Sequence, residues 1–252
     1  MRLPLVALLV VTAAVFARMP ARAQAPGASA VPDLSGTYWA TVYYPTVPMV
    51  GGGAPPLNDA GKTAYEKNRS GLRDGSLQDP TRKYCLPDSV PRLLASPYPF
   101  QLYQLPPGQV TFVHELNNQV RVVGLNVPLP SYEKASADPT YAGYGTARYE
   151  GDTLVIQAIG FNDQTFLDSS GLPHSDQLVT TERIRRMGNQ LEDVVTVHDP
   201  AYYTRDWQAR FVYERRTGLR LHEYACGDKH RDISRVKGIT EVRAARARKQ
   251  FP

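Results

Sequence analysis

Hydrophobic and polar residues alternate through the second half of this chain, which predicts short β-strands joined by tight turns. Four pairs of alternating segments flank turn signals at Asn117-Asn118, Gly151-Asp152, Gly188-Asn189 and Thr217-Gly218. The paired segments are 110–116 with 119–125, 144–150 with 153–161, 178–186 with 191–198, and 207–215 with 219–225. Two earlier segments, 34–44 and 100–104, are also predicted as strands because they are rich in β-branched and aromatic residues.

Roughly eight to ten consecutive strands with one apolar face each predict an antiparallel meander that closes into a barrel. The expected fold class is therefore mainly β: an antiparallel β-barrel of lipocalin or calycin type with short peripheral helices. A short helix is expected at 59–68 with Asp59 as its cap, and a terminal helix at 239–250. Proline-containing loops are expected at 45–58 and 126–143.

The first residues have the pattern of an export signal. Arg2 precedes an uncharged apolar run from Leu3 to Phe16, and the small residues Ala21 and Ala23 predict cleavage after Ala23. The run is shorter than the about 20 residues that span a bilayer, so no membrane span is expected after the signal is removed. The predicted organisation is a signal at 1–23, a flexible leader at 24–32, one barrel domain at 33–236 and a basic tail at 237–252.

Composition and charge narrow the class of partner. Hydrophobic residues make up 42% and charged residues 21%, which is typical of a globular chain, and the 21 prolines and 19 glycines have no fixed period. The formal net charge is +5, but three of the 29 basic residues lie in the signal, which leaves 26 against 24 acidic residues. The remaining excess lies mostly in the tail, so we expect no nucleic-acid partner. The pattern leaves the oligomeric state open.

Cys85 and Cys226 are the two cysteines of the chain. Export would place both in an oxidising compartment, periplasmic or extracellular, so a disulfide between them is expected and two free thiols are the alternative. Because the cysteines are isolated and no histidine pair has ligand spacing, we expect no bound metal and no cofactor.

Several motifs resemble known proteins. The run Gly36 to Trp39 is similar to the opening strand of lipocalin barrels, although Tyr38 stands where lipocalins have tryptophan. A longer set over residues 33–232 resembles a large family of exported proteins from soil bacteria: EGDTLV at 150–155, GFND at 160–163, Asp168 with Gly171, PHS at 173–175 and TER at 181–183. That resemblance implies export and fold and no particular reaction. The chain departs from the family at Tyr144, usually histidine, and at Gln157, often aspartate.

The loop from Asn162 to His174 is the strongest candidate for chemistry, because it gathers Asp163, Asp168 and His174 between two strands. A carboxylate can orient a histidine and tune its pKa, so His174 could act as a general acid or base with Asp163 or Asp168 as its partner. The same residues could instead ligate a metal, or form only a network of turn hydrogen bonds.

Alternation predicts that several ionisable side chains point into the barrel. Glu182 lies on the same face of the predicted strand 178–186 as apolar residues, so its carboxylate needs a partner, and Arg121 is the expected one. Glu182 would act as the second acid or base. Glu223 and Asp193 are predicted to point inward in the same way, which favours a polar-lined cavity. The alternative for Glu182 is a purely structural ion pair. We expect His174, Glu182 and Arg121 to converge on one site.

The chain has 15 tyrosines, and Tyr38, Tyr43 and Tyr144 are candidates to contact a ligand beside Arg121 and Glu223. Motifs of serine hydrolases, kinases and nicotinamide enzymes are missing. The favoured function is a cofactor-independent lyase or isomerase for a small aromatic or apolar carboxylate, by fold-level analogy with phenolic acid decarboxylases. The alternative is a non-catalytic periplasmic binding or carrier protein for a small hydrophobic ligand.

Overall fold

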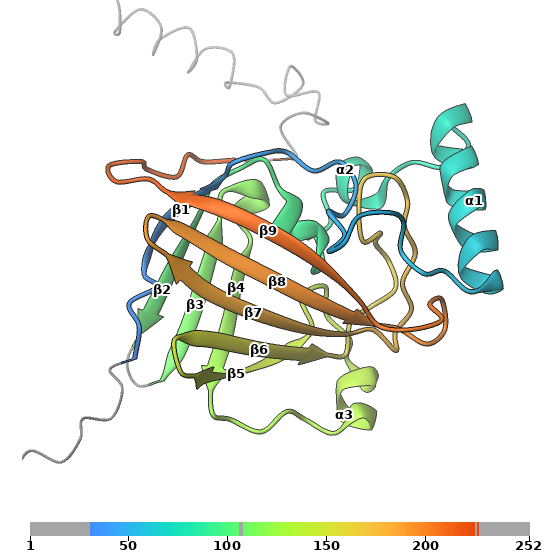
Figure 1. Cartoon of the computed structure of the whole chain (residues 1–252). Coiled ribbons are helices and arrows are strands. Elements are labelled where there is room, and N and C mark those ends of the chain that lie inside the picture. The colour runs from blue at the N-terminus through green and yellow to red at the C-terminus, as the bar shows by residue number, and fades with distance from the viewer. Residues whose placement is uncertain (1–30, 106–107, 225, 227–252) are drawn as a thin grey trace, which may run out of the picture. The chain divides into compact units, whose positions relative to one another are not determined.

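The computed structural model describes residues 31–105, 108–224 and 226, and its dominant feature is a closed barrel of nine strands. Each strand pairs with the next along the chain, and the last pairs with the first (Figure 1). The strands are β1 (Gly36–Ala40), β2 (Phe100–Leu105), β3 (Gln109–His114), β4 (Val120–Leu125), β5 (Tyr144–Glu150), β6 (Thr153–Ile159), β7 (Val179–Met187), β8 (Gln190–His198) and β9 (Trp207–Arg215). The predicted mainly β barrel is thereby confirmed.

Short helices occupy the connections between strands. The long link between β1 and β2 carries α1 (Asp59–Asp74), α2 (Pro80–Lys83) and the 3₁₀ helix η1 (Arg92–Ala95). A second 3₁₀ helix, η2 (Leu116–Asn118), turns β3 into β4, and α3 (Tyr132–Ala137) lies between β4 and β5. Every residue of η1 is buried, so this helix is part of the core and does not lie on the surface.

The barrel is antiparallel at every junction except that between β4 and β5. These two strands run parallel and pair only at Gly124 with Thr146 and Leu125 with Ala147. Parallel neighbours need a crossover connection, and the segment 126–143 with α3 provides it. All other junctions, including that of β9 with β1, are antiparallel, so the seam is the one break in a continuous antiparallel run around the barrel of the described chain.

Alternation along the strands sets which side chains enter the core. Along β7, Thr180, Glu182 and Ile184 are fully buried, whereas Arg183 and Arg185 point outward. Aromatic rings fill much of the interior: the ring of Phe100 lies 5.7 Å from that of Tyr38 and 4.9 Å from that of Tyr213. Each such ring removes a large apolar area from water, which is the main stabilising term of the fold.

Two predictions about elements are wrong. The segment 219–225 was expected to pair with β9, but its described residues 219–224 form no strand, because β9 uses its free edge to pair with β1. The cap of α1 is Asn58 rather than Asp59: the Asn58 side chain accepts a hydrogen bond from the Gly61 amide at 2.8 Å. The predicted signal, leader start and terminal helix lie outside the described residues.

The expected disulfide between Cys85 and Cys226 is present. It joins the segment after α2 to the end of the described chain, across a separation of 141 residues. The bond agrees with an oxidising, exported location.

Candidate functional site

A pocket of about 520 Å³ lies among the loops at an end of the barrel, where several separate segments meet. Its walls come from the residues after β1, from α2, from η1 and the turn that follows, from η2, and from the loop at 168–169. Tyr224 and Cys226 close the remaining side, so the disulfide fixes a wall of this pocket. Four tyrosines contribute to the lining: Tyr43, Tyr44, Tyr98 and Tyr224.

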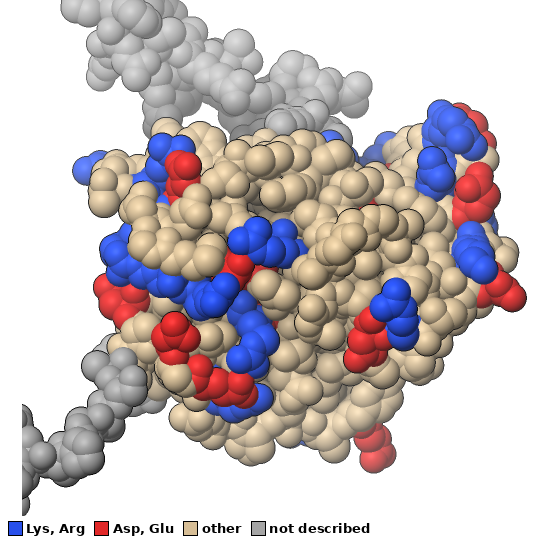
Figure 2. Space-filling model, in the orientation of Figure 1, with Lys and Arg blue, Asp and Glu red and all other residues tan. Residues whose placement is uncertain are grey.

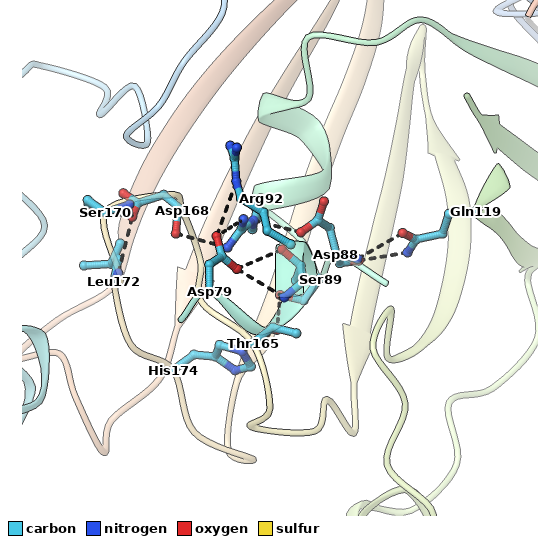
Figure 3. A network of polar contacts seen from close by, with 12 residues as sticks. Asp79, Asp88, Ser89, Arg92, Gln119, Thr165, Asp168, Ser170, Leu172 and His174 are labelled. Carbon is cyan, nitrogen blue, oxygen red and sulfur yellow. Dashed lines mark hydrogen bonds and ion pairs between the residues drawn. The ribbon is translucent and has the colours of Figure 1, made fainter. Parts of the chain in front are cut away.

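A buried ion network joins Asp88 and Arg92, which line the pocket and form its polar floor, to Asp79, which is outside the lining (Figure 3). Arg92 of η1 donates through Nη2 to Asp79 Oδ2 at 2.5 Å, and its Nε lies 2.8 Å from Asp88 Oδ1. Its Nη1 donates to the Asp168 carbonyl oxygen at 3.4 Å. The three side chains are nearly enclosed, with exposed fractions of 7% for Arg92, 10% for Asp79 and 7% for Asp88. All three nitrogens of the guanidinium are therefore engaged by the protein itself.

Asp79 and Asp88 hold Arg92 in different ways. Asp79 also caps α2, because its Oδ1 accepts hydrogen bonds from the Thr81 amide and hydroxyl. Asp88 is anchored through its backbone, which exchanges two hydrogen bonds with the Gln119 side chain (Figure 3). Burial raises the pKa of Asp88, and the adjacent Arg92 opposes that rise. The pocket lining thus contains a carboxyl group, Asp88, whose pKa is raised.

Asp168 also lines the pocket, but its carboxylate organises the loop. Oδ1 accepts from the Ser170 amide at 2.9 Å, the Ser170 hydroxyl at 2.6 Å and the Leu172 amide at 3.3 Å. Oδ2 accepts from the Val47 amide at 3.3 Å. These contacts are those of a turn network, because each one satisfies a donor of the loop itself or of the segment packed on it.

His174 is buried and held by neighbours outside the pocket lining. Its Nδ1 lies 3.2 Å from the Ser175 carbonyl oxygen and its Nε2 lies 3.2 Å from Thr165 Oγ1 (Figure 3). A carbonyl oxygen only accepts, so the contact with Ser175 is a donation from Nδ1. The Thr165 hydroxyl that contacts Nε2 also bonds to Ser89 Oγ at 3.2 Å. Burial lowers the pKa of His174, which keeps the ring neutral. The expected orienting carboxylates do not bond to the ring: Asp163 is exposed, and Asp168 is engaged as described.

The barrel interior contains the ion pair expected between β4 and β7. Arg121 donates through Nη1 and Nη2 to the two carboxylate oxygens of Glu182, at 2.7 and 2.5 Å. The side chains are 4% and 0% exposed. Burial disfavours the charge on Arg121, but the Glu182 carboxylate prevails and raises the pKa of Arg121. The hydrogen bonds of the described residues join Arg121 to Glu182 and place His174 in a separate network.

Two further ionisable groups surround this pair. Burial and the nearby Glu182 carboxylate raise the pKa of Asp193 well above its ordinary value, and Asp193 Oδ1 has no hydrogen-bond partner among the described residues. Burial and the Arg121 charge lower the pKa of His114 to about 3. The His114 ring stacks on Phe100 with 5.2 Å between centroids. Burial therefore disfavours the charged forms of Asp193 and His114, whereas Arg121 and Glu182 form the ion pair of this described group.

The remaining candidate residues are dispersed. Tyr38 is fully buried and its hydroxyl donates to the Leu34 carbonyl oxygen, so it belongs to the core. Tyr43 is 45% exposed and lines the pocket. Tyr144 is half-buried and donates to the Asp138 carbonyl oxygen. Glu223 was predicted to point inward, but it is exposed, because its segment forms no strand of the barrel.

Sequence reasoning missed the polar floor of the pocket. Asp79, Asp88 and Arg92 lie in a proline-rich stretch without periodicity, where no strand or helix pattern places side chains together. The usable signal is the separation of Asp88 and Arg92 by four residues, which is short enough for opposite charges to meet across the turn that precedes η1.

Comparison with known proteins adds little to this geometry. No family model matches the sequence, and no curated protein matches it. Among solved structures, a mutant of the fluorescent protein UnaG is similar, with a TM-score of 0.31 and 12% identity over 73% of this chain and 96% of that chain. Similarity at this level does not identify a ligand or an activity.

The described residues lack both a membrane-spanning helix and a cluster of metal ligands. No helix within them is long and apolar enough to cross a membrane. Their histidines, cysteines and carboxylates include no group of three or more that could hold a metal ion.

Proposed function

We propose that this protein binds a small aromatic carboxylate in the pocket at the end of the barrel, and that it acts as a binding or carrier protein. The pocket itself carries the proposal: its volume of about 520 Å³ lies within the range of small-molecule sites, and four tyrosines line it. Tyrosine rings supply a large apolar contact area together with a polar tip, which suits an aromatic ligand with oxygen substituents.

The charges of the lining favour an anionic group on that ligand. Arg92 is engaged by Asp79, Asp88 and the Asp168 carbonyl, so it offers no free nitrogen. Arg82 also lines the pocket, but its side chain is 67% exposed and its Nε lies 3.6 Å from Asp79. Its terminal nitrogens make no hydrogen bond within the described chain, so they remain available to a carboxylate.

Intrinsic fluorescence gives a direct assay. The indole Nε1 of Trp39 donates to the carbonyl oxygen of Pro97 at 2.7 Å, and Pro97 lines the pocket. Trp207, the other tryptophan, is buried in the barrel core. Titration with hydroxybenzoates and hydroxycinnamates is expected to change the emission of Trp39, and the change should vanish in Trp39→Phe while calorimetry still detects binding.

Matched variants test the assignment of the pocket. Tyr43→Ala should weaken binding of every aromatic ligand, and Arg82→Gln should weaken carboxylates but not the corresponding neutral phenols. Tyr132→Ala on α3 and Arg73→Gln on α1 remove the same groups from exposed positions outside the lining and should leave binding unchanged. Equal affinity in Tyr43→Ala and Tyr132→Ala would rule out this pocket as the site.

A second candidate function is acid catalysis of the lyase or isomerase type on the same ligand. It is favoured by Asp88, whose carboxyl lines the pocket with a raised pKa and can donate a proton to a bound substrate. Asp88→Asn should then abolish product formation and retain ligand binding. Unchanged turnover in that variant would exclude Asp88 as the proton donor.

A further inference from the structure

Arginines form a regular line across the outer face of the barrel. In the strand register, Arg148 of β5 pairs with Val155 of β6, Val155 with Arg183 of β7, Arg183 with Val194 of β8, and Val194 with Arg210 of β9. The line therefore alternates arginine and valine over five neighbouring strands. We call Arg148, Arg183 and Arg210 the arginine row. Neighbouring strands lie about 4.8 Å apart, so successive arginines of the row are about 10 Å apart.

The row is held in place by two carboxylates, exposed Glu150 and buried Glu192. Glu150 accepts from Arg148 and Arg183, and Glu192 accepts from Arg210 and from Arg185 on the adjacent line. The Glu192 side chain is only 7% exposed, whereas the side chains of Arg185 and Arg210 are 51% and 48% exposed. The guanidinium groups thus face solvent and partly cover a negative charge (Figure 2).

This arrangement leaves donors available for a further anion. Arg185 and Arg210 contact Glu192 through Nε alone, and Arg183 contacts Glu150 through Nη1 alone. Together with Arg185, the arginine row has four guanidinium groups that share the carboxylates of Glu150 and Glu192, so two positive charges are uncompensated among these six residues. Free terminal nitrogens on pre-positioned guanidinium groups are the arrangement that binds carboxylate, sulfate or phosphate bidentately.

We propose that the arginine row is a docking surface for a flexible acidic polysaccharide. The row spans four of the nine inter-strand intervals of a closed barrel, so it follows a curved surface. A flat membrane would contact only part of such a row, and duplex DNA is too stiff to bend around it. The residues between the arginines are valines, which offer no ring on which a single-stranded base could stack. A flexible polyanion with regularly spaced carboxylates fits all three observations.

Binding of the mature, full-length protein to immobilised polygalacturonate at low salt tests the proposal, with neutral dextran as the reference. Arg183→Gln with Arg210→Gln should weaken binding about tenfold or more, since each basic residue near an anionic surface contributes to the attraction. The matched control, Lys62→Gln with Lys67→Gln on α1, removes the same charge from exposed positions and should change binding by less than about twofold.

Three further measurements can overturn the proposal. Binding should be lost as salt rises to about 0.5 M, where screening reaches only a few ångströms, and salt-independent binding would contradict an electrostatic row. Equal or tighter binding of duplex DNA, or of anionic phospholipid vesicles, would refute the choice of polysaccharide. Arg183→Lys with Arg210→Lys, which retains the charge, should bind more tightly than the glutamine pair. If both pairs bind equally weakly, the positive charge at these two positions does not drive binding and the proposal fails.

Discussion

The buried pair between Arg121 and Glu182 gives a sharp test of how this barrel is stabilised. Both terminal nitrogens of Arg121 bond to Glu182, and neither side chain is more than 4% exposed. Arg121→Met removes the cation but keeps much of the side-chain volume. The Glu182 carboxylate then lies in the core without its partner, beside the buried carboxyl group of Asp193, which cannot supply a positive charge.

The expected magnitude follows from desolvation. Removing one partner of a buried ion pair costs about 3–5 kcal/mol, whereas replacing both partners with apolar groups is often neutral or stabilising. We therefore expect Arg121→Met to lower the unfolding free energy by about 4 kcal/mol. Arg121→Met combined with Glu182→Leu should restore stability to within about 1 kcal/mol of the wild type. The reference pair is Arg148 and Glu150 on the outer face, where removing either partner should cost less than about 1 kcal/mol.

Urea denaturation of the disulfide-bonded protein measures these differences, with thermal unfolding as a second probe. For a domain of this size a loss of 4 kcal/mol corresponds to a fall in Tm of about 10 °C. A single variant that loses less than about 1 kcal/mol would show that water reaches the pair. A double variant as unstable as the single one would show that the pair is required for the packing itself. Either result would refute the reasoning.

Three other outcomes are expected. His114 has a pKa of about 3 in the folded state, so only the unfolded state gains a proton at this group as pH falls below about 6.5. The unfolding free energy of the wild type should therefore fall by about 2 kcal/mol between pH 6.5 and 5 because of this group. His114→Phe should lose less stability over the same pH range, as measured by urea denaturation. Asp193 has a raised pKa in the folded state, so its contribution to stability is present below about pH 4 and is lost as pH rises. The gain in unfolding free energy of Asp193→Asn over the wild type should therefore be larger at pH 7 than at pH 4. Replacing Cys85 and Cys226 with serine should cost up to about 5 kcal/mol, and titration of the unfolded, unreduced protein should find no free thiol.

Much of the barrel could be predicted from the sequence because its strands are amphipathic and its turns are short. Gly151-Asp152 and Gly188-Asn189 mark two hairpins, and alternation from those turns places Glu182 and Asp193 inside. The same alternation is misleading after β9. Leu219 and Leu221 have the spacing of an inward face, but closure of β9 on β1 leaves no edge with which that segment could pair.

The candidate site was harder to predict because irregular segments build it. Asp79, Asp88 and Arg92 meet through two short helices and a turn, and the pocket wall at Cys226 depends on a contact 141 residues away in the chain. His174 lies between two strands as expected, but loop packing turns its ring toward Thr165 rather than into the barrel with Glu182. No local pattern specifies that choice, because it depends on which hydroxyl group the folded loop presents.

The parallel seam between β4 and β5 has a consequence for how the barrel opens and forms. Only two residue pairs join these strands, whereas β7 and β8 are joined by nine. Fewer ladder hydrogen bonds mean that local opening costs least at the seam, so the amides of β4 and β5 should exchange with solvent sooner than those of β7 and β8. The other closing junction, β1 with β9, joins residues far apart in the chain, and its loop entropy favours late formation. The β5–β9 meander is therefore expected to acquire protection from exchange first, and the cylinder to close around it afterwards.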